Sequence, residues 1–207
     1  MKVEIWSDYV CPFCYIGERN LELALKETGM KEDTQILFNS FELDPEAKDR
    51  YEGNINEIIA KKYNISLEQA IASNNNIISA AKKVGLDYNF DDLKPTNTFT
   101  AHRLSHYAKA EGKLKEYTEA VMKSYFIDSK LISDKEVLAS IAEKLGLDRE
   151  RTLNILESTE FSDQVRQDEL NAYERKINGV PYFIFDEKEA VHGAQPIDAF
   201  VKVIESI

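Results

Sequence analysis

Both cysteines of this 207-residue chain lie in one short motif, Cys11-Pro12-Phe13-Cys14. Disulfide exchange needs one reactive sulfur and a second sulfur close enough to displace the mixed disulfide, and two spacer residues on a first helical turn give that reach. A structural disulfide usually closes a longer loop, because a short loop removes little entropy from the unfolded chain. The motif therefore indicates redox chemistry.

The motif lies between a predicted strand, residues 3–6, and a predicted helix. A helix N-terminus offers unpaired N–H groups and a partial positive charge, which favour the thiolate of the first cysteine. Pro12 suits the first helical position because it has no N–H to leave unpaired, and the spacer Phe13 can tune the surroundings of the sulfur. We predict that Cys11 is the exposed, attacking sulfur and that Cys14 is the covered, resolving sulfur.

A zinc site is the main alternative chemistry for these cysteines. Zinc needs four N or S ligands, and the chain offers Cys11, Cys14, His102, His106 and His192. His102 and His106 share one face of a predicted helix. Zinc knuckles usually hold their cysteines in a turn of a small metal-stapled unit, however, and this chain has enough apolar sequence to fold without metal. We therefore expect no bound metal. Of His102 and His106, we expect one to line a groove and the other to be packed in the interior.

Two acidic residues near the motif are candidates for accepting the proton of a buried resolving thiol. Asp8 stands just before the motif, and Glu4 lies in the strand that leads into it. Solvation and loop capping explain both residues equally well, so both interpretations stay open.

The predicted elements follow the order β-α-β, a long helical segment, and then β-β-α, which is an α/β fold. The predicted strands are residues 3–6, 35–43, 182–185 and 189–192. Helical patterns cover residues 66–84, 97–111, 114–125, 133–145 and 161–177, and a last helix begins near Pro196. Ser66-x-x-Gln69 and Ser133-x-x-Glu136 have the spacing of capping boxes at two helix starts. Because no Gly/Ser linker is present, the helical segment should pack on the rest of the chain.

The composition argues against nucleic acid and anionic membranes as partners. The net charge is −11 with a pI near 4.9, and no stretch is dense in Lys or Arg, as a nucleic-acid binder would require. The N-terminus lacks an apolar signal core, and no run reaches the roughly 20 apolar residues of a membrane span. The sequence therefore predicts a cytoplasmic protein.

Three segments together resemble the FrnE-type branch of the DsbA family of thiol–disulfide oxidoreductases. Residues 5–17, IWSDYVCPFCYIG, resemble its active-site segment. Residues 179–183, GVPYF, resemble its cis-proline loop, and residues 191–196, VHGAQP, resemble its closing turn. The resemblance implies a thioredoxin-like domain made of residues 1–50 and 178–207, split by a helical insertion domain, residues 51–177.

The same resemblance implies roles for further residues. Pro181 would be cis and face the disulfide, and the Val180 backbone would pair with an extended peptide. Relatives that act on glutathione, the kappa-class glutathione transferases and the 2-hydroxychromene-2-carboxylate isomerases, have a serine in place of Cys11, so the cysteine here argues against their chemistry. In such enzymes Asn97 and His102 would lie near the substrate cleft. The alternative is that these two residues have only structural roles, as a helix cap and as part of a groove wall.

The resemblance thus implies an enzyme with no bound cofactor. Its partners would be protein or peptide thiols and disulfides, with glutathione or another small thiol as co-substrate. A second relay disulfide is excluded because the chain has no further cysteine. A glutathione-dependent isomerase or transferase acting on a small aromatic substrate is the alternative, and the motif does not decide whether clients are oxidised, reduced or isomerised.

Overall fold

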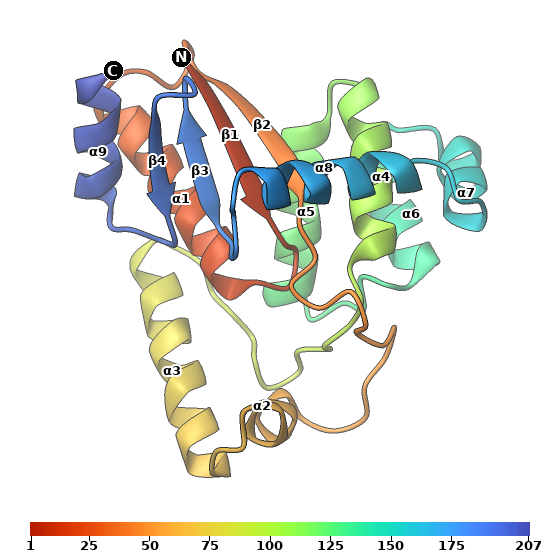
Figure 1. The fold of residues 1–207 in the computed structure, drawn as a ribbon. Coiled ribbons are helices and arrows are strands. Elements are labelled where there is room, and N and C mark those ends of the chain that lie inside the picture. The colour runs from red at the N-terminus through yellow and green to blue at the C-terminus, as the bar shows by residue number, and fades with distance from the viewer.

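Four strands form one mixed sheet in the computed structural model, which describes residues 1–207. The strands are β1 (Lys2–Ser7), β2 (Gln35–Ser40), β3 (Tyr182–Phe185) and β4 (Glu189–His192). Their order in the sheet is β2-β1-β3-β4 (Figure 1). β1 is parallel to β2 and antiparallel to β3, and β3 is antiparallel to β4. The central strand β1 therefore joins the first and last parts of the chain.

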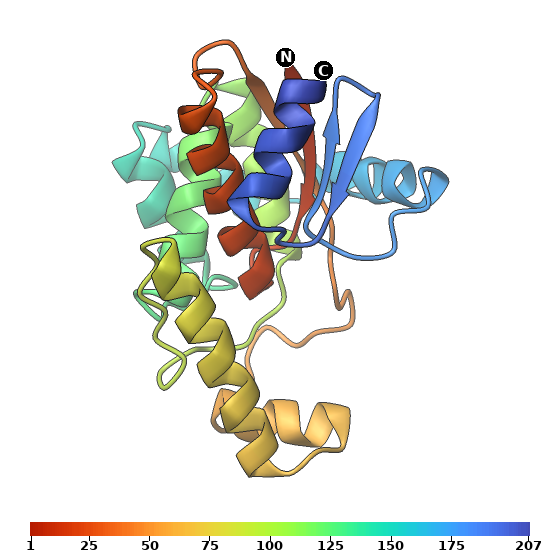
Figure 2. The ribbon, with the colours of Figure 1, turned by 90° about the vertical axis from the view of Figure 1, so that its left-hand side faces the viewer.

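The chain also forms nine helices. They are α1 (Pro12–Glu27), α2 (Ile55–Tyr63), α3 (Leu67–Lys83), α4 (Phe99–Ala110), α5 (Leu114–Phe126), α6 (Lys135–Lys144), α7 (Arg149–Glu157), α8 (Ser162–Glu174) and α9 (Ile197–Ser206). Two views at right angles place α1 and α9 on one face of the sheet and α8 on the other, with α2 and α3 projecting away from it (Figures 1 and 2). None of the nine is both long and apolar enough to cross a membrane.

The alternation of side chains along β1 determines what each face of the sheet buries. Val3 and Ile5 pack with Leu21 of α1 in the core under α1 and α9. Trp6 points to the opposite face, where it packs with Ala172 of α8. The start of α1, including both cysteines, belongs instead to a larger core that it shares with α4 to α7. The helical segment is thus packed on the redox motif, and the domain limits at residues 51 and 177 stay a prediction.

Of the two predicted capping boxes, one is confirmed and one is wrong. The capping box of Ser66 and Gln69 is present at the start of α3. At α6 the prediction was wrong by one residue, because Asp134 and not Ser133 accepts the backbone N–H of Glu136. A carboxylate one residue farther along competes well for the same unpaired N–H groups.

The remaining differences concern element limits. Strand β2 ends at Ser40, short of the predicted residue 43. The chain turns at Leu43, whose N–H donates to the carboxylate of Asp8, directly after β1, instead of to a neighbouring strand. The helices predicted over residues 97–111 and 161–177 are each shorter at both ends. Helices α2 and α7 were not recognised individually, and both bury few side chains.

Candidate active site

The two cysteines stand at the start of α1, as free thiols. Cys11 is the N-cap residue, with extended φ and ψ of −86° and 111°, and Pro12 opens the helix. The Cys14 side chain is fully buried, whereas Cys11 is 4% exposed. The sulfur of Cys11 is therefore the more accessible one. It is far less exposed than the sequence suggested. Core residues shared with α4 to α7 cover it, and so does the backbone at Val180, near the end of the chain.

A loop from the other end of the chain closes over Cys11. The Val180–Pro181 peptide bond is cis, and the Cys11 thiol donates to the Val180 carbonyl across 3.7 Å. The Val180 N–H has no partner within the chain. The structure thus brings Val180 and Pro181 to the sulfur, and one backbone donor beside it stays available to a bound peptide.

Gly17 allows this loop to approach α1 closely. A Cβ atom at this position would lie 3.0 Å from Cγ of Pro181 and 3.1 Å from the ring of Phe183. Such distances are shorter than normal contacts between packed atoms. The absence of a side chain at Gly17 therefore sets the spacing between the cysteine helix and the proline loop.

Burial is the main influence on Cys14. It raises the pKa of the Cys14 thiol well above its usual range, and the neighbouring Cys11 adds to the effect. The backbone N–H of Asp8, 3.5 Å from the Cys14 sulfur, acts in the opposite direction. Cys14 is therefore a protonated thiol at neutral pH, and it must lose its proton before it can attack a disulfide.

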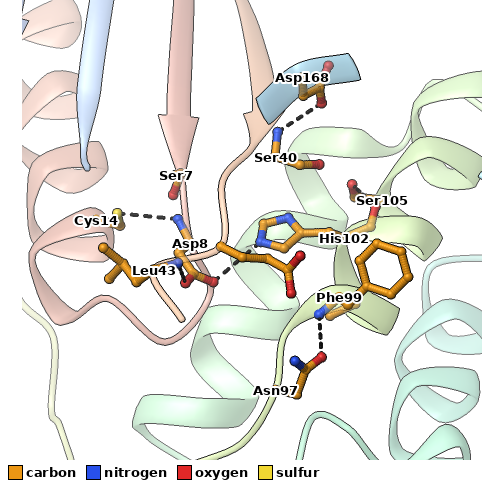
Figure 3. A network of polar contacts seen from close by, with 12 residues as sticks. Ser7, Asp8, Cys14, Ser40, Leu43, Asn97, Phe99, His102, Ser105 and Asp168 are labelled. Carbon is orange, nitrogen blue, oxygen red and sulfur yellow. Dashed lines mark hydrogen bonds and ion pairs between the residues drawn. The ribbon is translucent and has the colours of Figure 1, made fainter. Parts of the chain in front are cut away.

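The side chain of Asp8 points away from Cys14 into a polar network (Figure 3). Its Oδ2 accepts the Leu43 N–H at 2.8 Å, and its Oδ1 lies 3.3 Å from Nε2 of His102. His102 is 3% exposed and its ring lies against Tyr9, with centroids 4.7 Å apart. Asp8 therefore ties the end of β1 to the loop after β2 and to α4.

Asn97 and Glu4 take up structural positions. Oδ1 of Asn97 accepts the N–H of Phe99, so this side chain caps the first turn of α4 (Figure 3). Glu4 alternates with Val3 and Ile5 on β1, so it lies on the sheet face opposite α1 and pairs with Lys2 at 3.3 Å. A role for Glu4 in proton transfer to Cys14 was therefore a wrong hypothesis.

The histidines considered as zinc ligands have other partners. His106 lies 3.2 Å from Oδ2 of Asp168, which also accepts the Ser40 N–H. His192 lies on β4 beside the ring of Tyr182. No group of three or more His, Cys, Asp or Glu side chains is arranged to hold a metal ion.

The sequence analysis missed two residues that lie beside the motif, Tyr88 and Glu18. The Tyr88 hydroxyl donates to the Pro12 carbonyl at 2.8 Å. Glu18 lies one helical turn after Cys14, and its Oε1 accepts the hydroxyl of Ser7 at 2.8 Å. Of these, only Glu18 had a sequence signal, since it interrupts the apolar stripe of the first helix.

Comparison with known proteins identifies this arrangement. A family model described as a DSBA-like thioredoxin domain matches residues 2–205. The protein YwbO of Bacillus subtilis is 31% identical over 206 residues, which are 99% of this chain and 96% of YwbO. A 2-hydroxychromene-2-carboxylate isomerase of Pseudomonas putida is 25% identical, with 90% of this chain and 87% of the isomerase covered.

Among solved structures, the probable DsbA oxidoreductase SCO1869 of Streptomyces coelicolor superposes with a TM-score of 0.94 at 35% identity, covering 100% of this chain and 89% of that one. The predicted α/β fold, a thioredoxin-like fold with large helical content, is thereby confirmed. The predicted enzyme class is confirmed as well. The chain belongs to the DSBA-like thioredoxin domain family of thiol–disulfide oxidoreductases.

Proposed function

We propose that this protein catalyses thiol–disulfide exchange through Cys11 and Cys14, with Cys11 as the nucleophile. The observation that carries the proposal is the unequal placement of the two sulfurs. Cys11 caps α1 next to the Val180 carbonyl, whereas Cys14 is fully buried one turn farther along. A client can therefore reach only the Cys11 sulfur, and Cys14 is left to resolve the mixed disulfide.

In the reducing direction, the Cys11 thiolate attacks a client disulfide and one client thiolate leaves. Cys14 then loses its proton and attacks the Cys11 sulfur, so that the Cys11–Cys14 disulfide forms and the second client thiolate leaves. Two equivalents of a small thiol such as glutathione return the pair to the free thiols. The same steps run backwards oxidise a client dithiol.

The loop beside Cys11 supports a peptide as client. An extended peptide can accept the unpaired Val180 N–H through a backbone carbonyl, as a strand does at a sheet edge. Phe13, which is 46% exposed next to Cys11, offers an apolar contact for the same peptide. We propose that the reaction takes place in the cytoplasm, where the glutathione pool can reset the pair.

Matched single variants test the proposal, because the chain has only these two cysteines. Cys11→Ser should abolish insulin reduction in the presence of glutathione. Cys14→Ser should also stop turnover, but it should accumulate a mixed disulfide with the client that is visible by mass spectrometry under non-reducing conditions. Full insulin reduction by Cys11→Ser would contradict the proposal.

The isomerase alternative predicts a different pattern. A glutathione-dependent isomerase should convert 2-hydroxychromene-2-carboxylate in the presence of glutathione and should not need Cys14. Isomerisation by the wild type and by Cys14→Ser, without insulin reduction by either, would replace the oxidoreductase proposal with this one.

A further inference from the structure

The backbone beside Cys11 receives a hydrogen bond from a residue outside α1. Tyr88 lies in the connection between α3 and α4, and its hydroxyl donates to the carbonyl oxygen of Pro12 at 2.8 Å. Pro12 directly follows Cys11 and opens α1. In a regular helix this first carbonyl already accepts an N–H from one turn farther along, so the hydroxyl is an additional donor.

Aromatic packing determines where the Tyr88 hydroxyl points. The ring stacks on Phe126 of α5, with centroids 4.6 Å and planes 23° apart, and on Phe90, with centroids 5.7 Å apart. The N–H of the adjacent Asn89 donates to the Phe126 carbonyl at 2.7 Å. Since Tyr88 is also buried, its hydroxyl is held against Pro12 by α5 and not by the redox motif itself.

The peptide group that receives this bond has a free donor at its other end. The carbonyl of Pro12 and the N–H of Phe13 belong to the same peptide group, and this N–H has no partner within the chain. Phe13 is the second residue of α1, whose N-cap is Cys11, and an N-cap side chain accepts the N–H of the second or third helical residue. The third N–H, that of Cys14, already donates to the Cys11 carbonyl at 3.0 Å. The Phe13 N–H is therefore the donor left for the Cys11 sulfur.

The Cys11 sulfur needs such a donor when it ionises. As a thiol it donates to the Val180 carbonyl, and an acceptor in that place favours the protonated sulfur. A thiolate cannot donate, and it is stabilised by N–H groups that point at it. Because its other neighbour is a carbonyl, Cys11 depends for its reactive form on the strength of the Phe13 N–H as a donor.

A hydrogen bond to a carbonyl strengthens the N–H of the same peptide group. The hydroxyl draws electron density toward the carbonyl oxygen and away from the amide nitrogen, and hydrogen bonds joined in this way strengthen one another by about 10–30% per bond. Burial, followed by the neighbouring Tyr15, raises the pKa of the Tyr88 hydroxyl above its ordinary range. The charges of Cys11, Glu18 and Cys14 act in the same direction, so the hydroxyl stays protonated, and remains a donor, at every pH at which the cysteines react.

We propose that Tyr88 is a positioning residue for the nucleophile: its hydroxyl strengthens the Phe13 N–H through the Pro12 carbonyl and thereby stabilises the Cys11 thiolate. This inference rests on the proposed exchange function and adds a residue that sets the reactivity of its attacking sulfur. The Cys11 thiol releases its proton to solvent, and the thiolate then attacks the client disulfide. Once the new S–S bond has formed, the negative charge leaves on the client sulfur, so the donor acts before the exchange and not after it.

Ellman's reagent measures this effect in the Cys14→Ser background, where no second sulfur reacts. The Cys11 thiolate attacks the reagent, forms a mixed disulfide and releases one thionitrobenzoate, so the rate rises with pH to a plateau as the thiolate forms. Tyr88→Phe keeps the stacked ring and removes only the hydroxyl. The midpoint of the curve should move up by roughly half a pH unit, as expected for the loss of one bond in such a chain. The plateau should not fall, because a more basic thiolate is the better nucleophile.

Two further variants make the result specific. Tyr15→Phe removes the hydroxyl of a ring whose centroid lies 6.1 Å from that of Tyr88, but this hydroxyl donates to Glu119 and not to the motif, so the midpoint should stay in place. Replacement of Tyr88 by 3-fluorotyrosine, whose hydroxyl is more acidic and a stronger donor, should move the midpoint down. Glu18, whose pKa burial raises to about 8, titrates in the same range in every variant, so only the differences between the curves report on the hydroxyl.

A hydroxyl that only holds α1 in place would give a different result, a lower plateau with the midpoint unchanged. An unchanged midpoint in either Tyr88 variant, or an equal shift in Tyr15→Phe, would overturn the inference. If Tyr88→Phe does not fold, the fluorotyrosine variant, which keeps the hydrogen bond, decides alone. The proposed exchange function would survive a negative result, since it fails only if Cys11→Ser keeps full insulin reduction.

Discussion

The carboxylate of Asp8 and the imidazole of His102 meet inside the protein, with Oδ1 and Nε2 3.3 Å apart and both side chains at most 4% exposed. Asp8 also offers its N–H to the Cys14 sulfur. One residue thus contacts the resolving cysteine through its backbone and α4 through its side chain, so the helical segment helps to hold the redox motif in place.

Removing the Asp8 carboxylate should destabilise the fold. Asp8→Ala leaves the Leu43 N–H and the buried His102 ring without their partner. Each unsatisfied buried group costs about 1–3 kcal/mol, so the free energy of unfolding in urea should fall by at least that amount. Asp44→Ala is the matched control, because its pair with Lys62 is exposed and surface pairs contribute about 0–1 kcal/mol. Equal losses in both variants would contradict the assigned role of Asp8.

Gly17→Ala should disturb the site more than its small size suggests. The added methyl group would meet Pro181 and Phe183, and overpacking of this kind costs about 1–3 kcal/mol. Thermal unfolding should show the loss, and insulin reduction should slow because the proline loop is displaced from Cys11. Gly179→Ala, whose nearest contact would be 3.7 Å from His192, should be close to neutral. Equal losses of stability and activity in the two variants would argue against close packing of Pro181 on Gly17.

The unequal environments of the cysteines predict selective alkylation. Burial, with the adjacent Cys11, raises the pKa of the Cys14 thiol, so its reactive thiolate appears only at pH values above the usual cysteine range. Iodoacetamide near pH 7.5 should therefore modify Cys11 alone in the folded, reduced protein, and both cysteines after denaturation. Peptide mass spectrometry identifies the sites. Modification of Cys14 before Cys11 would contradict the assignment of nucleophile and resolving cysteine.

The raised pKa of Glu18 should make the stability of the fold depend on pH. Its pKa is about 8 in the folded protein, chiefly because of burial, against an ordinary value of 4.5. Between these values the unfolded chain has the ionised carboxylate while the folded protein keeps the proton, so folding loses stability as pH rises. Relative to Glu18→Gln, the wild type should therefore weaken from pH 4.5 to pH 8 and level off above. Urea unfolding at several pH values measures this difference, and parallel curves would contradict the raised pKa.

Loss of the Arg103 guanidinium should destabilise the helical segment. Its guanidinium donates to the carbonyls of Ile155, Ser158 and Glu160 at the end of α7. Arg103→Met keeps the length of the side chain but leaves these carbonyls without their donor, which should cost about 1.5–3 kcal/mol, as for hydrogen bonds to charged groups. Arg149→Met, which removes exposed pairs with Glu136 and Glu143, should cost less than about 1 kcal/mol.

The sequence predicted the parts of the site that depend on local chemistry. The C-x-x-C spacing and the adjacent strand and helix were enough to place Cys11 and Cys14 at the start of α1. The capping box at Ser66 likewise depends on residues a few positions apart. Such features could be predicted because their partners are neighbours in the chain.

The missed features depend on tertiary packing. Nothing near Gly17 in the sequence indicates that Pro181 will lie against it. The low exposure of Cys11 similarly results from a loop 169 residues away. Short, weakly apolar helices such as α7 bury only a few side chains, so their pattern is faint in the sequence.

The central position of β1 in the sheet has a consequence for the order of folding. This strand is made long before one of its two neighbours, β3, which spans residues Tyr182–Phe185. Contacts between such distant segments form late, because closing a long loop is entropically costly. During synthesis the two thiols therefore emerge long before the loop that covers Cys11, and for most of that time they are unshielded cysteines on an incomplete chain.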